Sequence, residues 1–341
     1  MNIPFFSNKK DDKTDNKKEP LTIERDVANP VETIETHETK QEEDAQPKPQ
    51  KNHYYIADFY RNAALYLMLS DFLEHIPEWF YEDVEFSAAY GSFPNCIWNG
   101  GRTLLGDINK TRMIKTVEEF NKRGIAVRYT FTNPLIEKKH LDDIFANICM
   151  EVANNGLNEV LVNSPVLEEY IREKYPNFKL ISSTTKCLMS LDQINAELDK
   201  DYYLVVLDSS LNNKEEIFTI PKRDRLEVLV DHGCRVDCPN RQAHYIASAQ
   251  AQLNYDVCQF LHCPHVERTF EQLKQNGSFI TREMITGKYN EAGFRHFKLD
   301  GRSFGNEKLL DSLMYYFVKP EYQDKMRGII QKEIYDRFKE M

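Results

Sequence analysis

Short apolar runs alternate regularly with amphipathic segments between Val84 and Val230, and this alternation limits most strongly how the chain can fold. Six runs have the length of a strand, and a segment with helical spacing or helix-start residues separates each from the next. The predicted strands are 84–89, 125–131, 159–163, 179–183, 203–207 and 226–230. Because no hairpin signal joins any two of them, the pattern predicts an α/β fold with a parallel sheet and helical crossovers.

Glycine and capping residues mark the ends of several predicted helices. Gly124 and Gly156 follow two amphipathic segments as natural C-terminal residues, and Ser164-Pro165 begins a third. Ser190 and Gln193 form a capping box for a fourth. The helices are predicted over 58–75, 110–123, 141–152, from 165, from 190, briefly from 212, and over 321–338.

A TIM-type (β/α) barrel is favoured over an open sheet. No glycine-rich dinucleotide fingerprint follows any predicted strand. The roughly 290 residues from His53 onward suit eight or nearly eight strand–helix units. The last strands are the least defined, since 279–280 and 294–299 are the only candidates after the sixth run. An incomplete or distorted barrel is therefore kept as an alternative.

The first 52 residues differ from the rest. From Ser7 to Asn52 there is no aromatic residue, and charged segments alternate with prolines, so burial cannot offset the entropy of ordering this stretch. We therefore expect a disordered tail over 1–52, with a protein partner as one role for it. Residues 53–341 are expected to form a single barrel domain with C-terminal helices and a four-cysteine insertion at 234–263.

Charge and hydropathy indicate in which compartment the protein lies and which classes of partner it binds. The formal net charge is −10, which gives no broad attraction for nucleic acid, although a local basic patch stays open. The N-terminus lacks a secretory signal, and no apolar run approaches the length of a membrane span. These features predict a cytoplasmic protein that does not bind membranes, in which clustered cysteines are reduced and available for metal binding or catalysis.

Four of the seven cysteines lie within one short stretch after the predicted strand 226–230. They form two close pairs, Cys234 with Cys238 and Cys258 with Cys263, as a 4Fe-4S cluster or a zinc ion requires. His244, His262 and His265 lie nearby as alternative zinc ligands. A structural role without metal also stays open. Radical-SAM spacing fails, because Arg241 stands where the third cysteine would be.

Polar residues at the predicted strand ends are the other candidates for chemistry, because barrel enzymes place their active sites there. The strand ends are Tyr90, Asn133, Asn163, Ser183-Thr184, Asp208, Asp231-His232 and Asp300-Gly301-Arg302. We expect His232 to act as general acid or base, with the Asp231 carboxylate placing its proton; a hydrogen-bonded structural role for His232 is the alternative. Arg102 and Arg302 could bind a carboxylate or phosphate, or form ion pairs at the barrel mouth. Asn133 and Ser183 complete the expected substrate-binding set.

Together these segments resemble the U32-like, collagenase-like peptidases of unknown catalytic type and their iron–sulfur relatives, which hydroxylate ubiquinone precursors or RNA bases without oxygen. The resemblance runs from about Val84 to Phe317. It is carried by Tyr90-Gly91, Gly101-Arg102, Val127 to Asn133, Ser183-Thr184, Leu226 to Cys234, the four cysteines, and Phe297 to Arg302.

The resemblance implies a barrel with a 4Fe-4S cluster on Cys234, Cys238, Cys258 and Cys263, next to a site for a small or peptide-linked substrate. Two departures stand out: the tight spacing of Cys234 and Cys238, and Asp208 near a position where arginine is common. The implied activity is oxygen-independent hydroxylation or a related redox modification. A peptidase and a zinc-stabilised scaffold without catalytic activity are the alternatives.

Overall fold

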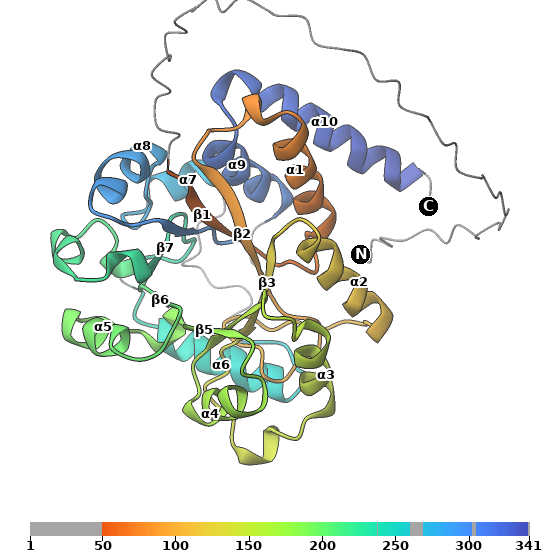
Figure 1. Ribbon diagram of the computed structural model, residues 1–341, viewed down its shortest axis with the longest axis vertical. Coiled ribbons are helices and arrows are strands. Elements are labelled where there is room, and N and C mark those ends of the chain that lie inside the picture. Colours follow the sequence, from red (N-terminus) through yellow and green to blue (C-terminus); the bar gives the residue numbers. More distant parts are fainter. Residues whose placement is uncertain (1–49, 237, 260–268, 302–304, 340–341) are drawn as a thin grey trace, which may run out of the picture. The chain divides into compact units, whose positions relative to one another are not determined.

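The chain folds into a closed parallel barrel, which confirms the predicted TIM-type architecture (Figure 1). The structure is a computed structural model and describes residues 50–236, 238–259, 269–301 and 305–339. Within these residues, eight strands pair in sequence order and the last pairs with the first. The strands are β1 (Asn52–Ala57), β2 (Val84–Gly91), β3 (Ala126–Phe131), β4 (Glu159–Val162), β5 (Lys179–Ser182), β6 (Leu204–Val206), β7 (Leu226–Leu229) and β8 (His296–Lys298).

Helices follow most strands and begin or end close to the predicted positions. Ser164 and Ser190 cap α4 and α5 through their side chains, and Gly124 and Gly156 have positive φ after α2 and α3. The helices are α1 (Ala63–His75), α2 (Lys110–Asn121), α3 (Ile144–Ala153), α4 (Pro165–Lys174), α5 (Leu191–Leu198), α6 (Arg241–Leu253), α7 (Phe270–Lys274), α8 (Arg282–Met284), α9 (Asn306–Phe317) and α10 (Pro320–Lys339). In the described part of the chain, none of them is long and apolar enough to cross a membrane.

Several elements differ from the prediction. Strand β1 and helices α6, α7, α8 and α9 were not predicted, and the first helix begins at Ala63 instead of Asp58. The segment expected to open a short helix at Asn212 forms a 3₁₀ turn over Glu215–Thr219. Of the two candidates for the last strand, the segment 294–299 supplies β8, while 279–280 lies between α7 and α8.

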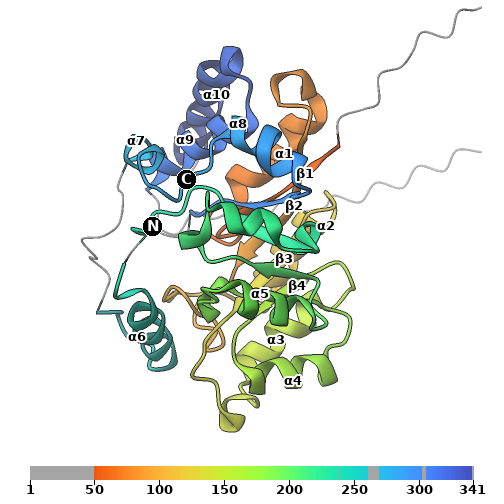
Figure 2. The ribbon, with the colours of Figure 1, turned by 90° about the vertical axis from the view of Figure 1, so that its left-hand side faces the viewer.

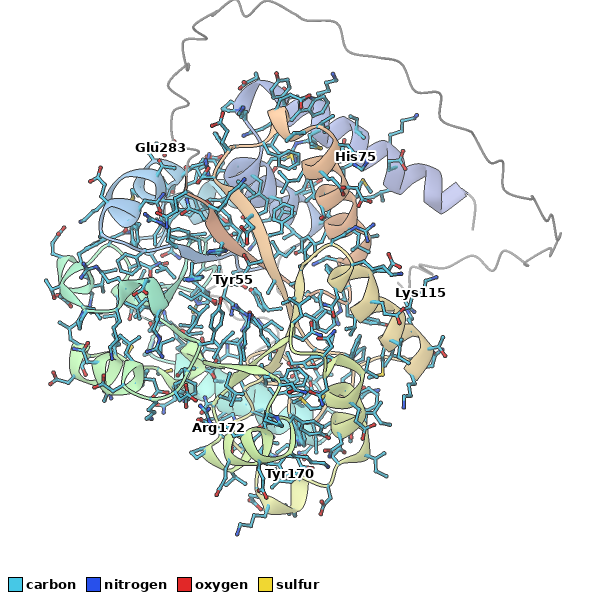
Figure 3. The ribbon with its side chains drawn as sticks, viewed as in Figure 1. Tyr55, His75, Lys115, Tyr170, Arg172 and Glu283 are labelled. Atoms are coloured by element: carbon cyan, nitrogen blue, oxygen red, sulfur yellow. The ribbon has the colours of Figure 1, made fainter. Side chains whose placement is uncertain are left out.

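The barrel lumen is filled by apolar side chains and by a buried ionic network. Arg128 donates from Nε to Glu159 at 2.6 Å and from Nη1 to Glu227, and the Lys298 ammonium lies 3.4 Å from the second oxygen of Glu227. The Arg128 guanidinium also stacks 3.7 Å from the ring centre of Tyr55, which Figure 3 places near the middle of the ring of strands. These four charged groups come from β3, β4, β7 and β8, so the network links neighbouring and opposite sides of the barrel.

Candidate functional site

The carboxyl ends of the strands surround a small cavity of about 50 Å³. The lining residues come from six of the strands or their following loops, and from α6, which contributes Tyr245. They are Tyr90, Gly101, Arg102, Thr130, Thr132, Leu161, Ser183, Thr184, Thr185, Leu229, His232, Tyr245, Lys298 and Asp300. The cavity therefore lies where (β/α) barrels carry their active sites.

His232 and Asp300 form a buried pair at the edge of this cavity. His232 Nδ1 lies 3.1 Å from Asp300 Oδ2, and both side chains are less than one-tenth exposed. The backbone N–H of Gly301 donates to Asp300 Oδ1 at 2.8 Å. Burial alone raises the pKa of Asp300, but the hydrogen bond from His232 and the nearby Arg102 charge outweigh it and hold the pKa well below its ordinary value. Asp300 is thus an ionised group that orients the His232 ring.

Asp231 lies behind this pair and does not line the cavity. Its Oδ1 accepts a hydrogen bond from the backbone N–H of Asp300 at 2.6 Å, and its Oδ2 accepts from the Ser312 hydroxyl of α9. Burial raises the pKa of Asp231 to about 7, and the neighbouring Asp300 charge adds to this effect. Of the two residues expected to catalyse, His232 reaches the cavity, while Asp231 supports the strand end that carries Asp300.

Two cations line the cavity, and the sequence analysis singled out one of them. Arg102 was expected, and it lies in the loop between β2 and α2, where Nη1 donates to the Gly101 carbonyl at 2.7 Å. Lys298 was missed: it is the last residue of β8, but the end of this strand was predicted at Asp300. Its ammonium lies 4.0 Å above the Tyr90 ring, and it faces the lumen with Glu227. The alternation of inward residues along β8 was the signal that could have found it.

The other expected substrate-binding residues have different positions. Ser183 lines the cavity, and its hydroxyl lies 3.0 Å from the Thr185 hydroxyl. Asn133 does not line it: its amide donates to the carbonyls of Ile97 and Ala249 at 3.0 and 3.2 Å, so it joins the β2–α2 loop to α6. Arg302 lies outside the described residues.

Helix α6 covers one side of the cavity and is anchored to the β2–α2 loop. Gln252 is fully buried; its Oε1 accepts from the Leu104 N–H at 2.7 Å, and its Nε2 donates to the Leu104 carbonyl at 3.3 Å. Thr103 donates to the Ser248 carbonyl at 3.4 Å. In Figure 2, α6 stands at the lower left, apart from α3 and α4. The cover therefore comes from the segment between β7 and β8 that also carries cysteines.

Cys234 and Cys238 lie in the loop that follows β7, two and six residues after His232. Burial raises the pKa of the Cys234 thiol to about 11; the Arg241 charge opposes this, and the neighbouring Cys238 thiol adds to it. Arg241 Nη1 donates to Asp208 at 2.5 Å, and Nη2 donates to the Arg235 carbonyl at 2.8 Å, which fixes this loop. The first pair of cysteines is thus brought together, and both thiols are partly exposed.

The second pair is only partly described. Cys258 is buried, and its sulfur lies 3.4 Å from the Ser248 hydroxyl of α6. Cys263 falls outside the described residues. Among the residues that the structure describes, no group of three or more His, Cys, Asp or Glu side chains is placed to hold a metal ion. Half of the expected ligand set is therefore close together in this structure.

Comparisons with known proteins give one similarity of fold. No family model matches the chain, and no curated protein matches it. A solved structure, described as that of the U32 peptidase Mk0906, aligns with 77% of this chain and 97% of its own, at a TM-score of 0.46 and 14% sequence identity.

Proposed function

We propose that the protein is an enzyme whose active site is the cavity at the carboxyl ends of the strands, with His232 as the group that takes up or releases a proton. The observation that carries this proposal is the buried His232–Asp300 pair on the cavity wall. An ionised carboxylate at Nδ1 fixes the tautomer of the ring, so the opposite nitrogen is the one available to a substrate.

The same geometry does not favour a serine peptidase. The Ser183 hydroxyl is hydrogen bonded to Thr185, through both the hydroxyl and the backbone N–H of that residue. A serine nucleophile instead needs its hydroxyl against the base. An acid–base reaction on a small or peptide-linked substrate therefore remains the main proposal.

We also propose a 4Fe-4S cluster on Cys234, Cys238, Cys258 and Cys263, beside this site. The support is that the first two thiols are neighbours in the loop that also carries His232. Because the pKa of Cys234 is raised, this thiol is protonated at neutral pH without metal, and metal binding would release the proton. A cluster bound here would supply electron transfer or bind the oxygen donor of a substrate. Zinc on the same thiols is the competing proposal.

Metabolite profiling tests the acid–base proposal without a known substrate. Wild-type protein is incubated with a metabolite extract and with a protein substrate such as casein, and compared with His232→Gln and with His75→Gln. His75 lies at the end of α1 and contacts the Asp71 carbonyl, far in sequence from the site. We expect wild type and His75→Gln to change the concentration of at least one metabolite that His232→Gln leaves unchanged. The same change at full rate in His232→Gln contradicts the proposal, and His232-dependent casein cleavage would favour the peptidase.

Anaerobic purification followed by iron, sulfide and zinc analysis tests the cofactor. We expect brown protein with iron and sulfide in equal amounts, lost in Cys238→Ser and kept in Cys187→Ser. Cys187 is a matched control because it is partly exposed and lies in the loop after β5. Colourless protein that contains zinc would contradict the cluster proposal and support the zinc proposal. Protein without any metal would contradict both proposals.

A further inference from the structure

Two polar atoms in the wall of the cavity have no hydrogen-bond partner among the described residues. One is His232 Nε2, since the contact with Asp300 is made by the other ring nitrogen. The second is the hydroxyl of Tyr245 on α6. Only 7% of His232 and 8% of Tyr245 is exposed, yet neither of these two atoms is fully buried. Because both residues line the cavity, their accessible surface faces it.

The other polar side chains of the wall have contacts within the protein or are closed off from the cavity. The Thr132 hydroxyl is fully buried and does not reach a ligand. A ligand would therefore gain its first hydrogen bonds from His232 and Tyr245, without displacing any existing contact. Those existing contacts join Tyr90 to the Leu299 carbonyl, Lys298 to Glu227, Thr130 to Asn99, Ser183 to Thr185, and Thr184 to the Leu207 carbonyl.

The Tyr245 hydroxyl differs from those of other buried tyrosines in this protein. A buried tyrosine usually packs its ring and finds a partner for its hydroxyl. Tyr66 and Tyr129 do so, because their hydroxyls donate to the carbonyls of Ala57 and Cys149 at 2.6 and 2.8 Å. The partner of the Tyr245 hydroxyl is instead whatever occupies the cavity, water or a substrate.

Helix α6 holds Tyr245 in a fixed position. Tyr245 lies on the buried face of the helix, one turn after Arg241 and two turns before Gln252. Arg241 donates to Asp208 at 2.5 Å, and Gln252 binds the backbone of Leu104 through both atoms of its amide. Both ends of α6 are thus tied to the barrel, so the hydroxyl is oriented before a substrate binds and costs no reorganisation during a reaction.

The two atoms have opposite hydrogen-bonding roles. Burial raises the pKa of the Tyr245 phenol well above its ordinary value, and the charges of Arg102 and Arg241 oppose this effect without cancelling it. The phenol therefore keeps its proton at neutral pH and is a donor. With Nδ1–H held against the ionised Asp300, Nε2 of the neutral His232 ring is an acceptor, which makes it a base.

The size and the apolar part of the cavity limit what lies between this base and this donor. A volume of about 50 Å³ holds roughly three to five water molecules, so one small molecule in it can contact both groups. Leu161 and Leu229 supply apolar surface in the same wall, which suits an aliphatic compound. A base and a neutral donor that face one small aliphatic molecule match a carbonyl compound, whose carbon gives up a proton while its oxygen gains charge.

We propose that Tyr245 is a second catalytic residue, which donates a hydrogen bond to the carbonyl oxygen of a small aliphatic aldehyde or ketone while His232 Nε2 removes a proton from the adjacent carbon. The C–H bond breaks, its electron pair forms a carbon–carbon double bond, and the carbonyl π electrons move onto the oxygen. Tyr245 stabilises this oxygen and keeps its own proton, and His232 returns a proton to carbon, so no further reactant is needed. This inference rests on the proposed function, since His232 is the base in both.

Proton exchange of acetone in D₂O, followed by ¹H NMR, tests the inference, because acetone is small enough for the cavity and has C–H bonds next to its carbonyl. We expect wild type to speed the loss of the methyl signal over protein-free buffer. The rate catalysed by Tyr245→Phe should be about a hundredfold lower, as when one donor to a developing oxyanion is removed. Tyr129→Phe is the matched control and should keep the wild-type rate, because it also removes a buried phenol hydroxyl.

Thermal unfolding separates a loss of catalysis from a loss of structure. Tyr245→Phe removes a hydroxyl that has no partner among the described residues, so its melting temperature should equal that of wild type. Tyr129→Phe loses its hydrogen bond to the Cys149 carbonyl and should melt at a lower temperature. A Tyr245→Phe variant that melts below Tyr129→Phe would show a structural role and contradict the inference.

The outcomes separate this inference from the proposed function. Exchange at the wild-type rate in Tyr245→Phe overturns the inference, as does wild-type protein that does not speed the exchange. Exchange that depends on Tyr245 and persists in His232→Gln keeps Tyr245 as the group that binds the oxygen and contradicts His232 as the base. A metabolite change that depends on His232 and is unaffected in Tyr245→Phe supports the proposed function and overturns the inference.

Discussion

Replacing Asp231 by asparagine should stabilise the protein at neutral and basic pH. The Asp231 carboxyl is fully buried between the β8 end and α9, and its pKa is raised to about 7 from an ordinary value of 3.8, mainly by burial. Asparagine can keep both contacts of this site. Its oxygen can accept from the Asp300 N–H, and its amide can donate to the Ser312 hydroxyl, which reverses the direction of that hydrogen bond.

The magnitude and the sign follow from proton linkage. The unfolded chain loses the Asp231 proton above about pH 4, whereas the folded chain keeps it until about pH 7. Between these values the folded state binds the extra proton, so the free energy of unfolding falls as pH rises. A pKa difference of about 3 units corresponds to about 4 kcal/mol. Asp231→Asn should therefore exceed wild type by about 4 kcal/mol at pH 8 and by close to zero at pH 4.

Urea unfolding of wild type, Asp231→Asn and Asp311→Asn at pH 4, 6 and 8 measures this difference. Asp311 precedes Ser312 on α9 and forms a partly exposed ion pair with Arg327 at 2.7 Å, so its replacement should change stability by less than about 1 kcal/mol. A gap between wild type and Asp231→Asn that does not grow with pH would refute the reasoning, because Asp231 would then be ionised in the folded protein at low pH.

Three further substitutions test other parts of the fold. Gly100→Ala should destabilise by about 3 kcal/mol in urea unfolding, since its Cβ would meet the Thr132 backbone; an unchanged midpoint would show that the loop can move away. Arg128→Met should cost about 3–5 kcal/mol, because it leaves buried carboxylates uncompensated; thermal unfolding checks this, and a loss under about 1 kcal/mol contradicts it. Gln252→Ala should speed hydrogen exchange in α6 and at Leu104 without changing that of β3 and β4; uniform acceleration would mean that α6 does not open separately.

The sequence predicted the six central strands well, because strands buried on both sides read as short apolar runs. It failed for β1, whose run Tyr54-Tyr55-Ile56 directly follows the charged tail and was not recognised as a strand. Helix α6 was missed for another reason. Its buried face includes Ser248, Ala249 and Gln252, since it packs on the polar groups of a barrel mouth and not on an apolar core.

Three of the candidate site residues, His232, Arg102 and Ser183, line one cavity in the structure, since parallel strands bring their carboxyl ends to one edge. Their roles stay predictions. The contact between Lys298 and Glu227 depends on packing distances. A sequence does not contain those distances without the fold.

The ionic network in the lumen also has a consequence for how the barrel closes. Its members sit on four separate strands, and side chains alternate between lumen and exterior along each. A shift of one residue in the register of β3, β4, β7 or β8 would move a charged side chain from the lumen to the face that packs on the helices. Its oppositely charged partner would then stay unpaired in the lumen. A barrel closed in the wrong register is therefore destabilised at several strands at once. Substitutions at these positions should be tolerated only in combinations that conserve the charge balance.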